Sequence, residues 1–303
     1  MIEVVRAGAL TTVQDLGRHG VAHLGVPRSG ALDEPAHRLA NRLVGNPESA
    51  ATLETTLTGT AVRLDAPATV AVTGATAPVR VGDRPVAWGA PVHVPAGAVL
   101  DVGTAAHGLR SYVAFSGGVD APPVLGSRST DLLSGLGPPR LSDGDRLPLG
   151  GAAGPPAAVD VVPVSAPARD LVLRLVLGPR HDWFTDTALE VLATARFQVA
   201  AASNRIALRT EGTALERAVH RELPSEGMVL GGVQVPPNGC PLVFLADHPT
   251  TGGYPVIGVV PVADLAAAAQ ARPGARVRFI PIHPPDHDAA RDGSGGNHGE
   301  RDR

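Results

Sequence analysis

Short apolar runs separated by glycine, proline and aspartate turns dominate the first half of the chain. From residue 62 to residue 118, apolar and polar positions alternate within short stretches. Such alternation is typical of half-buried β-strands, and the close, regular spacing of the turns indicates an antiparallel barrel or sandwich. The runs that we expect to form strands are VRL, TVAV, PVRV, PVHV, AVLDV and LRSYVAF.

One helix is predicted ahead of these strands, over residues 33–44. Asp33 can cap it, and Pro35 stands in the first turn, where proline is tolerated. Gly45 is placed to end the helix. The positions that follow helical spacing are Ala36, Leu39, Ala40, Leu43 and Val44.

The composition of the chain changes at two places. Residues 151–168 are small residues and prolines with almost no charge, so we interpret them as a linker between an N-terminal β-barrel domain, 1–150, and a C-terminal one, 169–283. Residues 284–303 hold no apolar side chain larger than alanine and are expected to be a disordered tail. In the second domain, strands are expected at 171–177, 196–200, 206–209, 228–235, 242–246, 256–262 and 276–282, and short helices at 183–192 and 263–270.

The overall composition indicates a folded, weakly charged protein. Hydrophobic residues make up 44% and charged residues 18% of the 303 residues, which is enough apolar material for a core. Aromatic residues are only 3%, which disfavours stacking platforms for bases or sugars. A net charge of −3 makes nucleic acid and anionic membranes poor partners.

All 26 basic residues are arginine, so this chain has no lysine for a Walker-A motif, a Schiff base or an attached biotin. A bound anion must therefore meet arginine, histidine or main-chain N–H groups. Cys240 is the single cysteine, which excludes an internal disulfide and a cysteine-based zinc site, and we expect no metal site. The N-terminus lacks the regions of a signal peptide, and no apolar run reaches the ~18 residues of a membrane span, so a cytoplasmic location is expected.

Residues 126–130 form the best candidate anion site in the first half. A glycine-started turn can point several N–H groups inward, and hydroxyls beside a forked guanidinium suit a carboxylate or phosphate. The alternative is an Asx- or ST-type turn whose arginine pairs with a nearby carboxylate, and from the residues alone we favour it. The residues concerned are Ser127, Arg128, Ser129 and Thr130.

The segment 246–255 is the best candidate for acid–base chemistry. Asp247 and His248 offer an acid–base pair, and the adjacent glycines that follow permit close approach of a ligand to the backbone. A tight hairpin explains the same residues equally well. The further residues assigned to substrate or anion binding are Asn204, Arg205, Thr251, Gly252, Gly253 and Tyr254. From the residues alone, we expect a β-rich protein with one or two clefts suited to anions.

Seven motifs in this order resemble one family closely. They are TTVQDLGR, GVPRSGALD, RLANRLVGN, GSRSTD, SNRIALR, SEGMVLGGVQVPPNG and DHPTTGGYPVIGVV, and together they span roughly residues 2–282. They resemble the family called allophanate hydrolase subunit 2, or biotin-dependent carboxyltransferase subunit, which includes KipA and the C subunit of the prokaryotic 5-oxoprolinase.

The resemblance implies a mainly β fold of two cyclophilin-like β-barrel domains with a few short helices. It implies a partner, the KipI-like or allophanate hydrolase subunit 1 protein, and a LamB/YcsF-type subunit is a further expected partner. It also implies a small-molecule substrate and chemistry on an amide.

The first function that the resemblance implies is a subunit of an ATP-dependent 5-oxoprolinase complex, a lactam hydrolase that converts 5-oxo-L-proline to L-glutamate, using ATP with magnesium, and is inactive without its partner. The second is a biotin-dependent carboxyltransferase subunit of the urea carboxylase type, with biotin carried on another polypeptide. The third is a KipA-like regulator, without catalysis, of a KipI-like inhibitor of a histidine kinase. We rank them in this order.

Several positions depart from the family pattern. Val256 stands where lysine is frequent, and His248 and Pro249 stand where arginine and glutamine are frequent. Ala207 and Thr210 replace a common glycine and leucine. Losing a cation beside Gly-Gly-Tyr-Pro weakens the carboxyltransferase alternative.

These observations lead to one spatial expectation. Residues 126–130 and 247–254 should line a single cleft between the domains, since the first supplies anion binding and the second an acid–base pair, and pockets often occur at domain boundaries.

Overall fold

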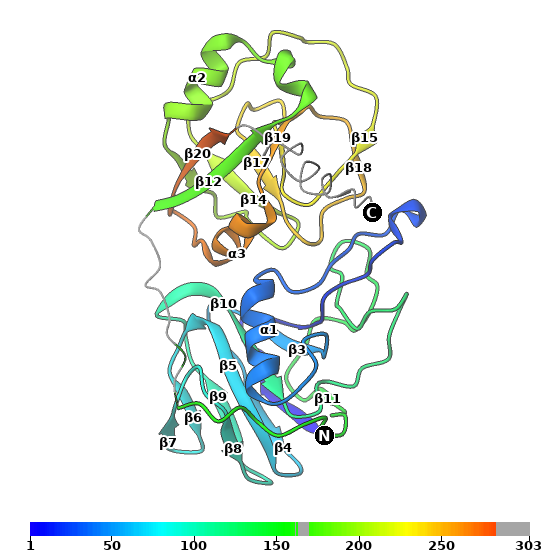
Figure 1. The fold of residues 1–303 in the computed structure, drawn as a ribbon, viewed down its shortest axis with the longest axis vertical. Helices are drawn as coiled ribbons and strands as arrows, with labels where there is room; N and C mark the ends of the chain where they lie inside the picture. Colours follow the sequence, from blue (N-terminus) through cyan, green and yellow to red (C-terminus); the bar gives the residue numbers. More distant parts are fainter. Residues whose placement is uncertain (161, 163–169, 283–303) are drawn as a thin grey trace, which may run out of the picture.

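The computed structural model describes residues 1–160, 162 and 170–282 and is mainly β (Figure 1). The expected linker falls partly outside the described residues, and the expected disordered tail lies entirely outside them. In the described part, α-helices are α1 (Glu34–Leu43), α2 (Asp186–Thr194) and α3 (Val262–Gln270), and short 3₁₀-helices are η1 (Ala22–Leu24) and η2 (Pro179–Trp183).

The first half of the chain forms two sheets that pack face to face. One has the strand order β11-β1-β4-β9-β6-β7, and the other has the order β2-β3-β10-β5-β8. The strands of the first are β1 (Ile2–Arg6), β4 (Ala61–Leu64), β6 (Val79–Val81), β7 (Arg84–Val86), β9 (Val99–Val102) and β11 (Arg146–Leu147). Those of the second are β2 (Leu10–Gln14), β3 (Thr52–Thr56), β5 (Ala68–Thr76), β8 (Val92–Val94) and β10 (His107–Phe115). The core between them is built from both, so this half is a sandwich.

The second half of the chain closes into a barrel of antiparallel pairs and one parallel pair, β12 with β20. In β12 the side chains of Leu171, Leu173 and Leu175 point inward, while Val172 and Arg174 are exposed, as period-two alternation requires. The barrel strands are β12 (Asp170–Leu177), β13 (Phe197–Val199), β14 (Ala207–Glu211), β16 (Gly232–Gln234), β17 (Leu242–Phe244), β19 (Val256–Val259) and β20 (Arg276–Ile282). A separate two-stranded sheet pairs β15 (Glu226–Gly227) with β18 (Thr251–Gly252).

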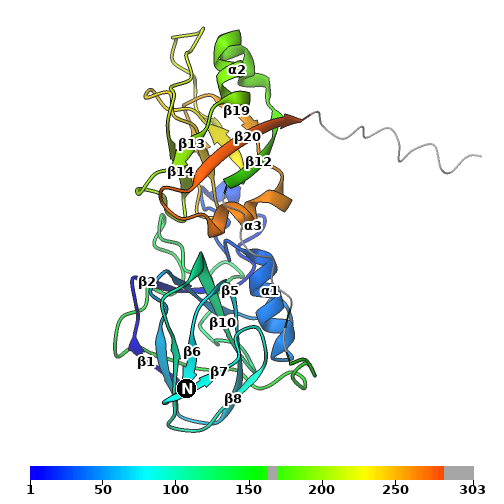
Figure 2. The same ribbon diagram turned by 90° about the vertical axis from the view of Figure 1, so that its left-hand side faces the viewer.

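Helix α1 begins as the sequence predicts. The carboxylate of Asp33 accepts a hydrogen bond from the Ala36 N–H at 3.1 Å, and Pro35 lies in the first turn. The apolar face of α1 packs against Ala71, Tyr112 and Ala114 on the outer face of the second sheet. Helix α1 therefore covers that sheet and lies beside the boundary with the barrel, as Figure 1 and Figure 2 show.

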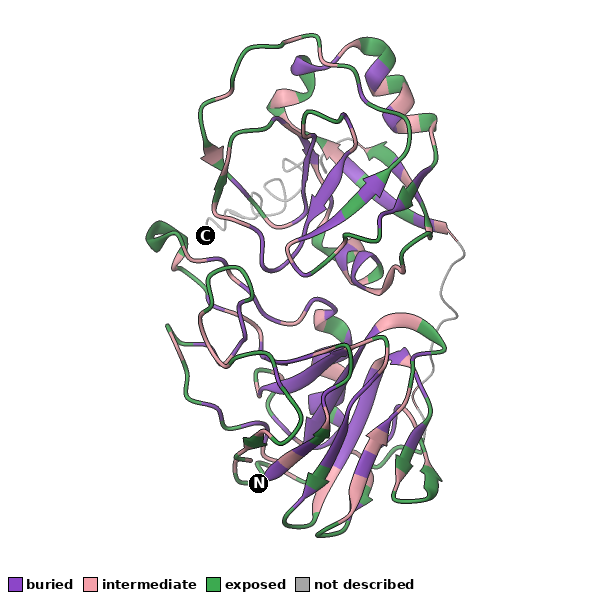
Figure 3. Cartoon of the chain, turned by 180° about the vertical axis from the view of Figure 1, so that it is seen from behind, coloured by how far each residue is buried: buried purple, intermediate pink, exposed green. Residues whose placement is uncertain are grey.

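The two halves are joined by the last turn of α3, which lies against a bulge in β10. The pairing of β10 with β5 is interrupted between His107 and Ser111, which frees main-chain groups there. Gln270 fills this gap: its Oε1 accepts from the N–H groups of Leu109 and Arg110 at 2.8 and 3.0 Å, and its Nε2 donates to the carbonyl of Arg110 at 2.9 Å. Buried residues lie within both halves and on the facing surfaces between them (Figure 3).

Candidate functional site

Arg205 is the centre of a buried ionic network at the boundary between the two halves. It follows the turn before β14 in the barrel, and its side chain is 1% exposed. Its Nη1 bonds to the carboxylate of Glu54 in the first half, and its Nε and Nη2 bond to Asp247 at 2.9 and 3.0 Å. Nη2 also donates to the carbonyl of Gly30 at 2.6 Å. These acceptors engage all three guanidinium nitrogens and come from both halves, so Arg205 holds the halves together. Its role in substrate binding stays a prediction.

Glu54 receives hydrogen bonds from three directions. The hydroxyl of Tyr112 donates at 2.8 Å and the N–H of Leu32 at 3.0 Å, in addition to Arg205. Burial raises the pKa of this carboxyl, but the charges of Arg205 and Arg110 outweigh it, so the pKa lies below its usual value. Glu54 is therefore a fixed buried charge. No local pattern in the sequence marks Glu54 as a site residue.

Asp247 lies in the same network, fully buried after β17. Its Oδ1 accepts from the hydroxyl of Ser29 at 2.9 Å, and the N–H of Ser29 donates to the carbonyl of Ala246 at 2.9 Å. Burial raises the pKa of Asp247 above its usual value, and the charge of Arg205 offsets only part of this rise. The contacts place Asp247 where it aligns Ser29 and Arg205, and a direct catalytic role for it stays a prediction.

His248 differs from its neighbour in having a free ring nitrogen. Its Nδ1 lies 2.7 Å from the carbonyl of Pro249, which can only accept, so Nδ1 carries the proton of the neutral ring. Nε2 makes no hydrogen bond within the described part of the chain and keeps its lone pair. Burial and the charge of Arg28 lower the pKa of His248. This geometry is that of a neutral imidazole able to accept a proton.

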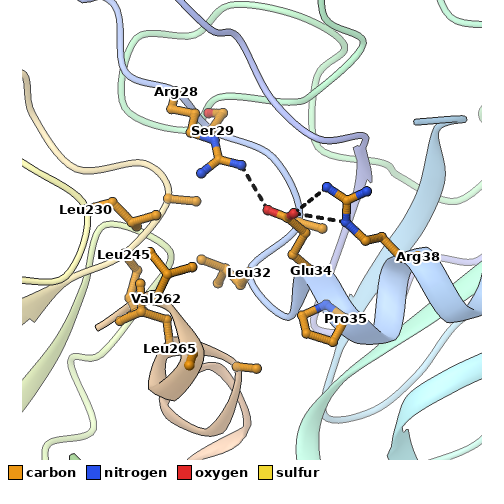
Figure 4. A pocket seen from close by; sticks show the side chains of 14 residues that line it. Arg28, Ser29, Leu32, Glu34, Pro35, Arg38, Leu230, Leu245, Val262 and Leu265 are labelled. Atoms are coloured by element: carbon orange, nitrogen blue, oxygen red, sulfur yellow. Dashed lines mark hydrogen bonds and ion pairs between the residues drawn. The ribbon is translucent and has the colours of Figure 1, made fainter. Parts of the chain in front are cut away.

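A cavity of about 200 Å³ lies beside this network, between the start of α1 and the barrel (Figure 4). Its apolar wall comes from both halves of the chain, and its charged residues are Arg28, Glu34 and Arg38. Ser29 and Ala246 also line it, so it adjoins the segments that carry Asp247 and His248. The apolar wall includes Leu32 and Pro35 from the first half and Leu230, Leu245, Val262 and Leu265 from the second.

The predicted anion site at residues 126–130 binds a carboxylate of the chain itself. The hydroxyls of Ser127 and Ser129 both donate to Asp15 at 2.6 Å, and the main-chain N–H of Arg128 donates to its other oxygen at 2.6 Å. Burial raises the pKa of Asp15, but these hydrogen bonds outweigh it and the pKa lies below its usual value. These are the contacts of a structural turn. Anion binding by these residues stays a prediction.

The other two members of that cluster also lie outside the cavity. The guanidinium of Arg128 forms a surface ion pair with Asp120 at 2.8 Å. Thr130 is buried, its N–H donates to the carbonyl of Val13, and its hydroxyl has no partner within the described residues. The favoured alternative from the sequence, a turn whose arginine pairs with a nearby carboxylate, describes these contacts.

Arg18 connects the two predicted segments. It is buried, and it donates to the carbonyls of Val124 and Ser129 at 3.1 and 2.5 Å. The charges of Asp131, Asp15 and Asp247 act on its guanidinium, so both segments approach the same arginine. They do not line one cavity as expected: the cavity described above is lined by Ala246, but by none of residues 126–130 or 247–254.

The remaining predicted binding residues form turns. The carboxamide oxygen of Asn204 accepts from the N–H groups of Ile206 and Ala207 at 2.8 and 3.2 Å, which is an Asx turn. Thr251 and Gly252 pair with β15, and a Cβ at Gly252 would lie 3.0 Å from Nε2 of Gln234. Gly253 follows, and Tyr254 is 44% exposed. The close approach at Gly252 is therefore to the barrel, and ligand binding by these residues stays a prediction.

Metal-ligand clusters and membrane-spanning helices are both absent from the described residues. Among residues 1–160, 162 and 170–282, no three histidine, cysteine, aspartate or glutamate side chains are grouped so as to hold a metal ion. None of the helices in the same part of the chain has the length and apolar character needed to cross a bilayer.

Comparison with known proteins identifies the family. Residues 24–281 match the family model described as carboxyltransferase domain, subdomain A and B. The chain is 40% identical over 283 residues to the C subunit of 5-oxoprolinase from Escherichia coli (strain K12), covering 92% of this chain and 91% of that protein. It is 32% identical over 309 residues to urea amidolyase of Lachancea kluyveri, where it covers only 17% of the relative.

Solved structures agree with this assignment. The crystal structure of the K. lactis urea amidolyase matches with a TM-score of 0.85 and 30% identity, covering 93% of this chain and 18% of that one. The chain thus spans about a sixth of the length of the urea amidolyases. The resemblance seen in the sequence motifs and the mainly β fold that it implied are both confirmed. This chain belongs to the family of carboxyltransferase domains composed of subdomains A and B.

Proposed function

We propose that this chain is the C-type subunit of an ATP-dependent 5-oxoprolinase, which opens the lactam of 5-oxo-L-proline to give L-glutamate. The observation that carries the proposal is the 40% identity to the C subunit of a 5-oxoprolinase, which extends over nine-tenths of both chains. The name of that relative implies partner subunits, and we assign a KipI-like protein as the partner of this chain.

The geometry supports chemistry on an amide beside the cavity. Opening a lactam requires a water molecule to attack the amide carbon, and a positioned base that accepts the proton of that water assists the attack. His248 suits this role because its ring is neutral and Nε2 has a free lone pair. Asp247 acts on the reaction through Ser29, which lines the cavity and whose hydroxyl donates to Asp247.

ATP supplies the activation of the amide oxygen that makes the ring opening favourable. The cavity does not fit this cofactor, because about 200 Å³ is below the ~300–1,000 Å³ of pockets that enclose larger ligands. We therefore assign nucleotide binding to a partner subunit and route no step of it through this chain.

The test is to purify the chain together with its partner subunits and to measure glutamate formation from 5-oxoproline with and without ATP. We expect turnover by the complex and none by this chain alone. His248→Asn should lower kcat by roughly 100-fold or more, which is the contribution typical of a general base. The exposed His93→Asn serves as the matched control and should leave kcat unchanged.

The urea amidolyase relatives favour a second candidate, biotin-dependent carboxyl transfer. Having no lysine, this chain would accept biotin carried by another polypeptide. A complex that fails to hydrolyse 5-oxoproline but carboxylates urea from carboxybiotin would replace the first proposal by the second.

A further inference from the structure

Of the two arginines that line the cavity, Arg28 has N–H groups that make no hydrogen bond with the described residues. Arg38 is fully engaged: its Nε and Nη2 donate to Glu34 at 3.0 and 2.6 Å, and its Nη1 donates to Glu48 at 2.6 Å. Arg28 uses only Nη2, which contacts Glu34 at 2.9 Å and the carbonyl of Leu16 at 3.3 Å.

The Nε atom of Arg28 is buried and has no hydrogen-bond partner among the described residues. A buried donor without an acceptor is costly, and such groups in folded proteins call for a water, an ion or a ligand. Figure 4 shows the guanidinium of Arg28 extending from the rim toward Glu34, above the apolar wall that includes Leu32 and Leu230. Its Nη1 also makes no hydrogen bond with the described residues, and because Arg28 lines the cavity, this nitrogen is placed to meet a ligand there.

The charges around the cavity fit a single negative charge. Arg28, Arg38 and Arg42 form a continuous ladder of ion pairs with Glu34 and Glu48. Of these five residues only Arg28, Glu34 and Arg38 line the cavity, and two guanidinium groups beside one carboxylate leave one positive charge in excess there. Glu34, directly beside Arg28, disfavours a dianion such as a phosphate monoester, whereas a monocarboxylate balances the charge of the cavity.

The size and lining of the cavity describe the rest of the ligand. About 200 Å³ is below the ~300–1,000 Å³ of pockets that enclose drug-sized ligands, which suits one small ring. The wall is mostly leucine, alanine, valine and proline, so the body of the ligand is apolar. We propose that the cavity binds a compact cyclic monocarboxylate and that Arg28 binds its carboxylate group.

This inference rests on the proposed function, because 5-oxo-L-proline is a five-membered ring with one carboxylate. It adds the residue that recognises the substrate. Urea has no charge and offers Arg28 no carboxylate, so Arg28 separates the two reactions considered for this family. Arg28 is then a specificity residue for the reaction.

The test compares Arg28→Gln with the matched control Arg42→Gln in the assembled complex. Arg42 belongs to the same ladder but does not line the cavity. We expect Arg28→Gln to raise KM for 5-oxoproline roughly 10- to 100-fold with kcat within about twofold, because a charge-assisted hydrogen bond to the substrate is lost. Arg28→Lys should recover part of this loss, and Arg42→Gln should leave KM unchanged.

A second substrate tests whether the effect of Arg28→Gln depends on the carboxylate of the ligand. For 2-pyrrolidinone, which is the same lactam without the carboxylate, Arg28→Gln should change kcat/KM by no more than about twofold. Equal losses for both lactams would overturn the assignment, since they would indicate a general disturbance of the site.

A binding measurement separates this inference from the proposed function. The chain alone is titrated with 5-oxoproline and with cyclopentanecarboxylate by saturation-transfer NMR, for the unmodified protein and Arg28→Gln. Binding that Arg28→Gln abolishes, in a complex that does not hydrolyse 5-oxoproline, would support the inference and reject the proposed function. Hydrolysis of 5-oxoproline with a KM that Arg28→Gln does not change would support the proposed function and reject the role of Arg28.

Discussion

The guanidinium of Arg205, carried by the barrel, bonds to the carboxylate of Glu54 in the sandwich, and both side chains are only 1% exposed. They lie 151 residues apart in the sequence. A charge pair buried between two folded halves needs both partners, because removing one leaves the other charged and out of contact with water, which destabilises the fold. The first prediction concerns this pair.

Arg205→Met should lower the free energy of unfolding by about 3–5 kcal/mol, since it leaves both Glu54 and Asp247 buried without their cation. Adding Glu54→Gln should recover part of the loss. The control is Arg174→Met, which breaks the exposed ion pair with Asp264 and should cost no more than about 1 kcal/mol. Urea unfolding of the three variants gives the comparison, and equal costs for the two arginines would contradict the buried role.

The second prediction separates the two residues assigned to acid–base chemistry. The sequence alone predicts that Asp247→Asn lowers kcat with folding intact. Its contacts with Arg205 and Ser29 instead predict a loss of about 2–4 kcal/mol in unfolding free energy. His248→Asn removes only one hydrogen bond to Pro249 and should lose about 1 kcal/mol or less. A melting temperature unchanged in Asp247→Asn would restore the expectation from the sequence.

The third prediction uses two glycines of the same loop. Gly17 and Gly20 both have positive φ, +87° and +79°, so alanine strains the backbone at either. A Cβ at Gly17 would lie 2.6 Å from the carbonyl oxygen of Arg28, whereas nothing lies within 4 Å of one at Gly20. Gly17→Ala should therefore destabilise the protein by about 1–3 kcal/mol more than Gly20→Ala.

Because Gly17 contacts the main chain of residues 28 and 29, Gly17→Ala should also displace the segment that lines the cavity. We expect a raised KM in the complex for Gly17→Ala and an unchanged KM for Gly20→Ala. If the two variants have the same stability and the same KM, the close approach of Gly17 to the main chain of residues 28 and 29 is not required for either.

The fourth prediction concerns pH. Burial lowers the pKa of His37 to about 4, although the hydrogen bond of its ring to the carbonyl of Glu48 opposes this shift. In the unfolded chain the pKa is near 6.5, so between these values only the unfolded state takes up the proton. The stability that His37 contributes is full above pH 6.5 and is lost as the pH falls toward 4, by roughly 3 kcal/mol in total.

Urea unfolding at several pH values from 4.5 to 7 measures this slope. The variant His37→Gln should be less stable at neutral pH and should show a shallower decrease toward acid. The exposed His93→Gln should keep the slope of the unmodified protein. An identical slope in His37→Gln would assign the acid sensitivity to other groups.

The sequence predicted the regular elements where one face is apolar and the other polar. Helix α1 and strands such as β5, β10 and β12 lie where expected, since capping and alternation mark them. Strands β2 and β3 were missed. They read LTTVQ and TLETT, and four of their five threonines, Gln14 and Glu54 are buried, so polar side chains occupy positions that the alternation rule assigns to apolar ones.

The site was predicted only in part, and for a related reason. Glycines and an acid–base pair mark the segment with Asp247 and His248 in the sequence. It follows Ala246, which lines the cavity, but none of residues 247–254 lines the cavity itself. Glu54 and Gln270 act across the boundary between the halves, and no local pattern reveals a partner more than 150 residues away. The unpaired Nε of Arg28 and its place at the cavity likewise follow only from three-dimensional packing.

The parallel pairing of β12 with β20 has a consequence for synthesis on the ribosome. The barrel is closed by Arg276–Ile282, the last strand of the described chain, which pairs with β12 and β13 from the start of the same half. The sandwich has all its strands once residue 147 has emerged, whereas the barrel stays open until almost the whole chain has been made. Arg205, Asp247 and the cavity wall are therefore assembled last, against a sandwich that is already folded.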